Sequence, residues 1–160
     1  MKTLVVYYSR TGNTRKIADE LAAALKADVE ELKDGKNRGG PIGFLMAGRE
    51  AMKKTPANLA PLAHDPAAYD LVAVGTPVWG GTICPPVRTF MAQQRGHLKK
   101  VAWFCTCGSD DGSSPRKAFP EMTAECGLSP MATLGLGPKA VKGDHSGEVS
   151  GFAASLSAHH

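Results

Sequence analysis

The sequence predicts an α/β fold in which five parallel strands form one open, doubly wound sheet with helices on both faces. Three observations favour this class. Short apolar, β-branched runs alternate with segments of helical periodicity along the chain. The runs are apolar at nearly every position, as in parallel strands buried on both faces. No repeat or shift in composition divides the 160 residues, so we expect one domain over residues 1–160.

The first half of the chain supplies two strands, two helices and a long connection. Residues 3–8 (TLVVYY) form the first strand, and apolar residues then recur at helical spacing over residues 12–26. Residues 27–32 are expected to form a short second strand. After the loop GKNRGGP, residues 42–54 are expected to form an amphipathic helix and residues 55–69 a Pro-rich connection.

The second half continues the alternation. Strands are expected at 70–75, 101–105 and 131–136, and helices at about 85–96, 121–126 and 149–156. Pro85 and Pro86 suit the first positions of a helix, whereas Pro120 leaves the start of the next helix undetermined. His159 and His160 resemble the start of a purification tag and are assigned no role.

Composition and charge limit the possible partners. The formal charge of +4 and the pI of about 8.9 are mildly basic, but Asp and Glu are interspersed with the Lys and Arg residues, so we expect no nucleic-acid partner. The longest apolar candidate, GFLMAG, is too short to span a bilayer, and Met1 leads directly into a strand without a signal-peptide pattern. We therefore expect a cytoplasmic protein with no membrane partner.

The cysteine and histidine residues do not suggest a metal site or a disulfide framework. The chain lacks the paired CxxC spacing of structural zinc sites, and its cysteines are few and irregularly spaced, so reduced thiols are expected. The histidines are scattered and are expected at the surface. The residues concerned are Cys84, Cys105, Cys107, Cys126, His64, His97 and His145.

Three unusual loops follow expected strands. They are SRTGNT at 9–14, TPVWGGT at 76–82 and CTCGSDDGSS at 105–114. In doubly wound sheets, ligands bind outside the carboxyl ends of the strands, near the point where the winding direction reverses. The joint placement of the three loops predicts a ligand site at that edge.

The loop SRTGNT predicts a phosphate site. It leads into a helix N-terminus, whose free amides and positive dipole end favour an anion. Ser9, Thr11 and Thr14 add hydroxyl donors, Asn13 adds an amide donor, and Gly12 allows close approach of the backbone. No Lys follows in the position typical of an ATP or GTP phosphate loop. The alternative is that these side chains only cap the helix.

The segment VVYYSRTGNTRKIADEL resembles the signature of the flavodoxins. Aromatic Tyr7 and small or hydroxyl residues stand at the positions which that signature requires, and the similarity extends to VGTPVWGGT and FCTCG. It is closer to a branch of flavodoxin-like proteins than to the short acidic flavodoxins. The resemblance implies a flavodoxin-like fold, a noncovalently bound riboflavin monophosphate (FMN) and a role in electron transfer.

By resemblance, the first loop would hold the FMN phosphate and the other two loops the flavin ring. Trp79 would stack on the ring, and the peptide of Gly80 would hydrogen-bond a ring nitrogen. Ordinary packing beneath the loop is the alternative for Trp79. The FMN-contacting residues implied are Ser9, Arg10, Thr11, Gly12, Asn13, Thr14, Thr76, Pro77, Val78, Trp79, Gly80, Gly81, Cys105, Thr106, Cys107, Gly108, Ser109 and Asp110.

The third loop departs from the family pattern because it lacks the Tyr that covers the outer face of the flavin in many flavodoxins. The helix near Phe44 and Leu45 is a candidate replacement. Cys105 and Cys107 allow a thiol or metal role, although packing at the end of a strand is commoner. A phosphatase loop is excluded, since no Arg stands at the required distance after either cysteine.

The predicted function is that of a flavodoxin-like electron carrier. FMN would carry the redox chemistry, so no catalytic side chain is expected. The transient partners would be a reductase and an electron acceptor, and the positive net charge of this chain favours partners with an acidic surface. Two alternatives stay open. One is an FMN-dependent oxidoreductase of the NAD(P)H:quinone type, which an open flavin face would suit, and the other is a flavin-free binding module on the same scaffold.

Overall fold

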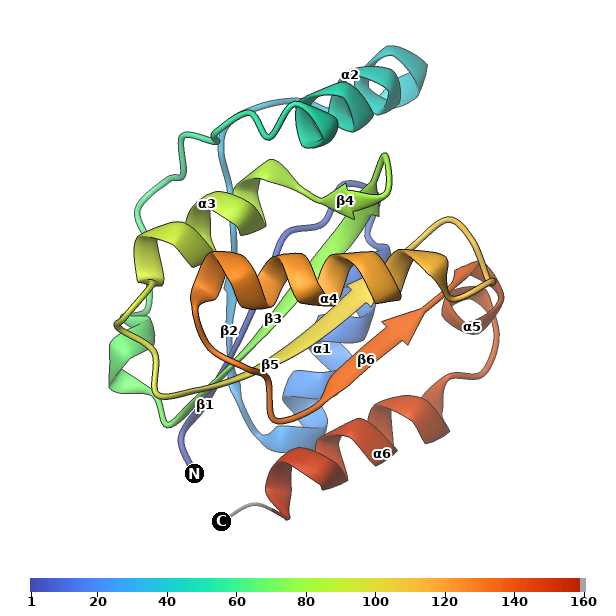
Figure 1. Cartoon of the computed structure of the whole chain (residues 1–160). Helices are drawn as coiled ribbons and strands as arrows, with labels where there is room; N and C mark the ends of the chain where they lie inside the picture. Colours follow the sequence, from blue (N-terminus) through green and yellow to red (C-terminus); the bar gives the residue numbers. More distant parts are fainter. Residues whose placement is uncertain (159–160) are drawn as a thin grey trace.

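Five parallel strands form the sheet, and helices cover both of its faces (Figure 1). The computed structural model describes residues 1–158, so His159 and His160 lie outside the described residues. The strand order is β2-β1-β3-β5-β6, and a short β4 pairs antiparallel with the end of β3. This arrangement confirms the predicted doubly wound α/β class. The strands are β1 (Thr3–Tyr7), β2 (Asp28–Glu31), β3 (Leu71–Trp79), β4 (Thr82–Ile83), β5 (Lys100–Thr106) and β6 (Thr133–Leu136).

Six α-helices and one short 3₁₀ turn connect the strands over residues 1–158. Helix α1 follows its apolar periodicity, and α3 begins with two prolines whose missing N–H groups cost nothing at a helix start. No described helix is long and apolar enough to cross a membrane. The helices are α1 (Asn13–Leu25), α2 (Gly40–Met52), α3 (Pro85–Gln94), α4 (Ser113–Cys126), α5 (Pro138–Lys142) and α6 (Ser146–Ser157), and the 3₁₀ turn is η1 (Pro66–Ala68).

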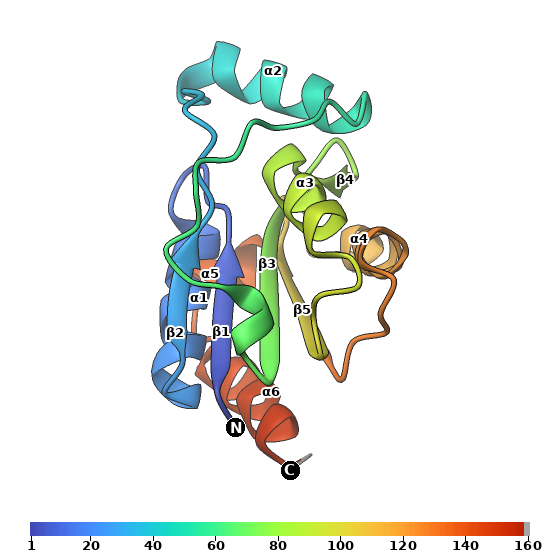
Figure 2. The same ribbon diagram turned by 90° about the vertical axis from the view of Figure 1, so that its left-hand side faces the viewer.

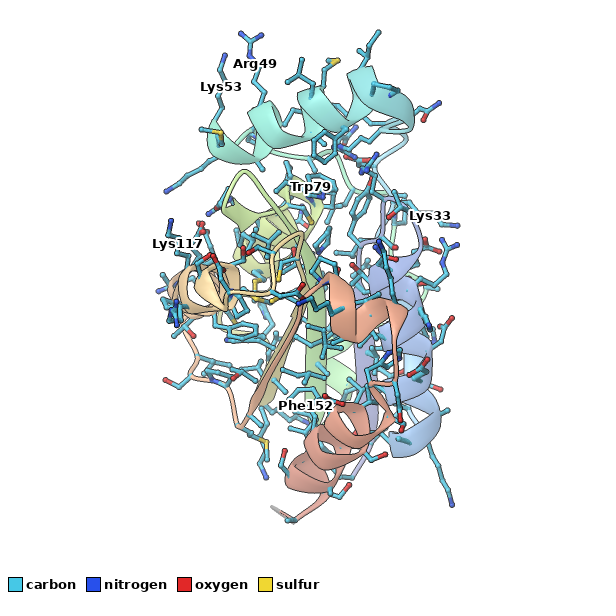
Figure 3. All side chains as sticks on the ribbon, turned by 90° about the vertical axis from the view of Figure 1, so that its right-hand side faces the viewer. Lys33, Arg49, Lys53, Trp79, Lys117 and Phe152 are labelled. Atoms are coloured by element: carbon cyan, nitrogen blue, oxygen red, sulfur yellow. The ribbon has the colours of Figure 1, made fainter. Side chains whose placement is uncertain are left out.

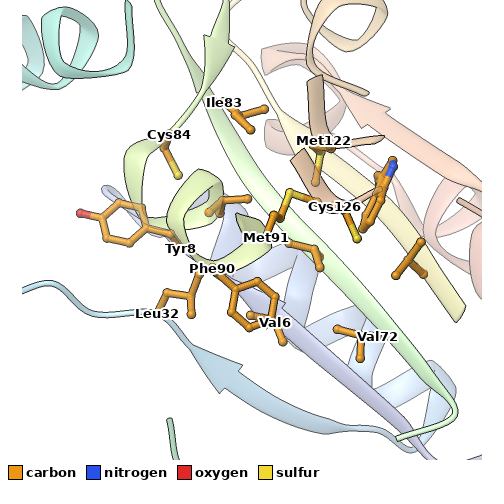
Figure 4. Close-up of a cluster of buried hydrophobic side chains, with 14 of the residues drawn as sticks. Val6, Tyr8, Leu32, Val72, Ile83, Cys84, Phe90, Met91, Met122 and Cys126 are labelled. Atoms are coloured by element: carbon orange, nitrogen blue, oxygen red, sulfur yellow. The ribbon is translucent and has the colours of Figure 1, made fainter. Parts of the chain in front are cut away.

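Each face of the sheet has its own apolar core. Helices α1 and α6 pack on one face, where Leu21 and Leu156 are fully buried. Figure 4 shows the other cluster, in which Phe90 and Met91 of α3 and Met122 of α4 are buried against the sheet. Burial on both faces explains why the strand sequences are apolar at consecutive positions.

The structure differs from the expected elements in four places. Strand β3 continues to Trp79, so the segment TPVW is strand, and the turn that follows it leads into β4. Helix α4 begins at Ser113 and includes Pro120, which is exposed, so the helix tolerates the lost N–H there. Strand β6 begins only at Thr133, and α5 was not predicted. Pro120 misled the prediction for α4 because it lies inside the helix.

Helix α2 does not pack on a face of the sheet. It lies across the carboxyl ends of the strands, as Figures 1 and 2 both show. Its buried side is made of Gly43, Ala47 and Ala51, which recur every four residues. A Cβ at Gly43 would lie 2.4 Å from the backbone carbon of Arg38. These small residues therefore allow α2 to sit close to the loop that precedes it.

Candidate functional site

A cavity of about 750 Å³ lies at the carboxyl ends of β1, β3 and β5. Figure 3 views the side of the molecule on which the ends of these strands, α2 and α5 come together. All three predicted loops contribute to its wall, together with α2 and α5. The predicted residues that line it are Ser9, Arg10, Thr11, Asn13, Thr14, Pro77, Val78, Trp79, Gly80, Thr106, Cys107 and Gly108.

The first loop is held in shape by its own polar groups. Gly12 caps α1 at a φ of 99°, a left-handed conformation that glycine adopts without strain. The N–H of Gly12 donates to Ser9 Oγ at 3.0 Å. Helix α1 begins at Asn13, so the amides of its first turn have no helical acceptors and are available to a ligand. Gly12 is not part of the cavity wall, and its role is to turn the chain.

Trp79 is mostly enclosed by protein. Trp79 is 8% exposed. Its ring lies edge-on to the Tyr8 ring, with the two ring centres 5.6 Å apart, and the guanidinium carbon of Arg38 lies 5.6 Å from the centre of the Trp79 ring. The indole therefore packs beneath the loop and presents only a small part of itself to the cavity. Packing and a ligand contact are both compatible with this position.

Two other residues of the second segment lie outside the cavity wall. Thr76 is fully buried, and its hydroxyl donates to the Pro77 carbonyl while accepting from the Cys84 N–H. Gly81 belongs to the turn between β3 and β4, at a φ of 79°. Both residues shape the segment that carries Val78, Trp79 and Gly80.

Only some residues of the third loop line the cavity, and the others pack or hydrogen-bond in the structure around it. Cys105 is buried, Ser109 does not line the cavity, and Asp110 accepts a hydrogen bond from the Lys139 N–H at 3.1 Å. Asp110 thus ties the loop to the start of α5 and does not reach the ligand space. Thr106, Cys107 and Gly108 remain in the wall.

The two cysteines of this loop do not favour thiolate chemistry. Burial raises the pKa of the Cys105 thiol to about 12, and burial also raises the pKa of Cys107. Both are therefore protonated at neutral pH, and all four cysteines are free thiols. Among residues 1–158, no group of three His, Cys, Asp or Glu side chains is placed to hold a metal ion.

Thr14 and Thr106 join two of the loops. Their hydroxyl oxygens lie 2.8 Å apart, and both side chains are buried at the cavity wall. Thr14 lies in the first turn of α1, and Thr106 is the last residue of β5. This hydrogen bond fixes the first loop relative to the third.

Arg38 anchors α2 above the site. Its guanidinium donates to both carboxylate oxygens of Asp34, at 3.0 and 2.7 Å, to Glu50 of α2 at 3.0 Å and to the Tyr8 hydroxyl at 2.9 Å. Burial by itself would lower the pKa of Arg38, but the hydrogen bonds that it donates to Asp34 and Tyr8 outweigh this effect and raise that pKa. The sequence GKNRGGP gave no sign of this buried cluster, because two of its members, Tyr8 and Glu50, are distant from Arg38 in the chain.

Helices α2 and α5 supply wall residues that the sequence did not identify as FMN contacts. Phe44 and Leu45, which were considered as a cover, do line the cavity. Every charged side chain of the wall is basic, and these are Arg10, Arg49, Lys53 and Lys142. The further wall residues from the two helices are Gly48, Met52, Pro138 and Val141.

The prediction that His145 is a surface residue was wrong. His145 is 5% exposed, and its Nε2 lies 2.7 Å from a Glu20 carboxylate oxygen. Nδ1 lies 2.8 Å from the Ala140 carbonyl oxygen, so both ring nitrogens face acceptors. Burial lowers the pKa of His145, but the hydrogen bonds to Ala140 and Glu20 outweigh this and raise it. This cluster holds α5, and hence one wall of the cavity, against α1.

No protein-family model matches this sequence, and no curated protein matches it. Solved structures do match. The flavoprotein from Lactobacillus acidophilus NCFM in complex with FMN aligns with a TM-score of 0.70 and 25% identity over 84% of this chain and 92% of that chain. Oxidised flavodoxin 2 from Bacillus cereus aligns with a TM-score of 0.62 and 21% identity, and the flavodoxin of Streptococcus pneumoniae TIGR4 aligns with a TM-score of 0.60 and 18% identity. Each alignment covers 100% of both chains. The similarity therefore covers most or all of each chain.

Proposed function

We propose, from the flavodoxin-like fold of this chain, that it binds FMN noncovalently in the cavity beneath α2 and acts as an electron-transfer protein. One observation carries the proposal. A single cavity has a helix N-terminus with hydroxyl and amide donors at one part of its wall and apolar side chains at another. FMN combines a phosphate dianion with a flat, largely apolar ring system.

The residues at the phosphate part of the wall fit such a ligand. Thr11 and Asn13 are exposed and free to donate, and Ser9 keeps its hydroxyl proton while its oxygen accepts from the Gly12 N–H. The free amides and positive end of α1 favour a dianion there. Arg10 of the same loop adds to this preference, and the described wall contains no carboxylate that would oppose it.

The apolar part of the wall fits the ring. Val78 and Trp79 approach it from β3, and Phe44, Leu45 and Met52 approach it from α2. FMN, when bound, would supply the capacity to take up and release electrons. The chain's own residues would exclude water from the ring and fix its orientation, while the protonated thiol of Cys107 adds no negative charge.

Reconstitution tests the proposal. The protein is loaded with FMN, desalted, and reduced anaerobically while its visible absorption is followed. Retained flavin that is reduced in two separate one-electron steps supports a one-electron carrier. Retained flavin reduced in a single two-electron step, together with rapid NAD(P)H oxidation by the protein alone, would instead indicate a reductase. Loss of all flavin on desalting would contradict the proposal and favour a flavin-free binding module.

Riboflavin provides a matched ligand control, because it has the ring of FMN without the phosphate. Charge-assisted hydrogen bonds contribute about 1.5–3 kcal/mol each, so riboflavin should bind at least about 100-fold more weakly than FMN. A Thr11→Ala/Asn13→Ala variant should narrow that difference. Equal affinities for the two ligands would show that the first loop does not hold the phosphate.

A further inference from the structure

Exposed apolar side chains are concentrated on one helix. In the described part of the chain, the large apolar side chains that are exposed are Met1, Ile42, Phe44, Leu45, Met46 and Met52. All of them except Met1 belong to α2. Concentration of such side chains on one element marks an interaction site, whereas isolated ones are ordinary.

The cavity accounts for only some of these side chains. Phe44, Leu45 and Met52 line it and would face a bound flavin. Ile42 and Met46 do not line the cavity, yet they are 76% and 54% exposed. They are four residues apart and so lie together on the helix surface.

Positive charge lies next to this apolar pair. Arg49 lies one turn after Met46, and Lys53 directly follows the helix. Both are exposed and form no ion pair within residues 1–158, although parts of both side chains also line the cavity. Figure 3 shows both side chains extending from α2 on the side away from the sheet. Glu50, the one carboxylate of α2, is turned to Arg38 and Lys36. The outer face is therefore apolar and positive.

We propose that this outer face of α2, made of Ile42, Met46, Arg49 and Lys53, is the docking site of an acidic electron-transfer protein. The proposal rests on the proposed function, since it assumes a flavin in the cavity. Charge complementarity identifies the partner: a face with free cations and no free carboxylate attracts an acidic surface and repels a basic one. The apolar pair would supply the dry centre that a transient interface needs.

The position of α2 suits electron transfer. The helix covers the cavity, with Met52 and the Gly48 carbonyl packed close to Gly80 at the end of β3. A partner on the outer face would be separated from the flavin by the thickness of one helix, about 10 Å. The same face would suit an anionic membrane less well, because only Ile42 and Met46 remain free to insert into the interface.

The test uses FMN-loaded protein and an acidic [2Fe–2S] ferredoxin as the probe. Each reduced ferredoxin passes one electron to the flavin, and stopped-flow absorption measures the rate. Ile42→Glu/Met46→Glu is compared with Lys99→Gln/Lys100→Gln, which lowers the net charge by the same amount at the amino end of β5. Neither pair lines the cavity, so FMN affinity should stay at the wild-type value in both.

We expect the α2 variant to be reduced at least about tenfold more slowly than wild type and the control less than about twofold, with the wild-type rate falling as salt is raised. Equal rates for the two variants, or a wild-type rate that salt does not lower, would overturn the docking site. So would wild-type binding to phosphatidylglycerol vesicles that the α2 variant abolishes, since a membrane would then be the partner.

Flavin retention distinguishes failure of the proposed function from failure of the docking proposal. Wild-type protein that retains no FMN overturns the proposed function, and the docking proposal with it. Wild-type protein that retains FMN while the α2 variant loses it would place Ile42 and Met46 in the flavin site and overturn docking alone.

Discussion

The hydroxyl oxygens of Thr14 and Thr106 lie 2.8 Å apart, although the two residues are 92 positions apart in the sequence. Both side chains are buried. The pair connects the first turn of α1 to the carboxyl end of β5, and so it sets the spacing between the proposed phosphate loop and the third loop. Its loss should therefore affect both stability and ligand affinity.

Thr14→Val and Thr106→Val should each lower the free energy of unfolding by about 1–3 kcal/mol, because each leaves the other hydroxyl buried without its partner. The double variant should lose less than the sum of the two. A double-mutant cycle from urea denaturation measures this coupling. Strictly additive losses would show that the hydroxyls do not interact in solution.

Trp79→Phe should weaken FMN binding by about tenfold, since a smaller ring leaves space at the cavity wall. Trp103→Phe is the matched control, because Trp103 is fully buried in the core of the α4 side and does not line the cavity. It should lower stability without changing FMN affinity. Fluorescence titration with FMN distinguishes the two, and equal affinities for both variants would leave Trp79 with a packing role only.

Gly80→Ala should disturb the packing of α2 against the end of β3. Gly80 has a φ of 58°, and an added Cβ would lie 2.6 Å from Met52 Cγ and 3.2 Å from the Gly48 carbonyl oxygen. The left-handed conformation alone costs about 1–2 kcal/mol for a residue other than glycine. We expect a lower midpoint of thermal unfolding and weaker FMN binding.

A second substitution separates the two causes. Met52→Ala in the Gly80→Ala background removes the flexible side chain that the new Cβ meets, but it leaves the backbone cost in place. Part of the lost stability should therefore return. If none returned, contact with Met52 would not be the source of the effect.

Arg38→Met should release α2 from its position above the cavity or destabilise the whole domain. It would leave Asp34, which is buried, and Glu50 without their cation, at a cost of about 3–5 kcal/mol in the free energy of unfolding. Arg15→Met breaks the exposed pair with Glu31 and should cost less than about 1 kcal/mol. Urea denaturation of both variants gives the comparison, and similar losses would show that the Arg38 cluster is not tightly coupled.

His145 should make stability depend on pH. Its pKa is raised above the ordinary value of 6.5 in the folded state, so the protonated ring stabilises the fold fully below about pH 6.5, and this contribution is lost as pH rises through the folded pKa. His145→Gln should flatten the fall in stability above pH 6.5. His97→Gln, at an exposed position, should leave the profile unchanged. An unchanged profile in His145→Gln would exclude this residue as its source.

Local sequence patterns were sufficient for much of the fold. Strands β1 (Thr3–Tyr7) and β5 (Lys100–Thr106) were predicted at 3–8 and 101–105, because strands buried on both faces are apolar at nearly every position. The Ser9–Thr14 loop could be placed before a helix, since small polar residues and glycine mark helix starts. Pro120 misled the prediction of α4, because an exposed proline is tolerated inside that helix.

Within the candidate site, the sequence could not separate wall residues from the residues that support them. Thr76 has the same side chain as Thr11 and Thr106, yet it does not line the cavity, and Asp110 is hydrogen-bonded to the Lys139 N–H. Whether a side chain faces the cavity depends on neighbours that are distant in the chain. His145 was misplaced for the same reason, since its partner Glu20 lies on α1.

The sequence by itself determined the parallel sheet, the polar loop before α1 and the resemblance to flavodoxins, because each is encoded in consecutive residues. Only the tertiary structure decided that α2 covers the cavity and carries the exposed apolar and basic face. That position depends on Gly43, Ala47 and Ala51 packing closely and on Arg38 reaching Glu50, contacts between elements that no local periodicity encodes.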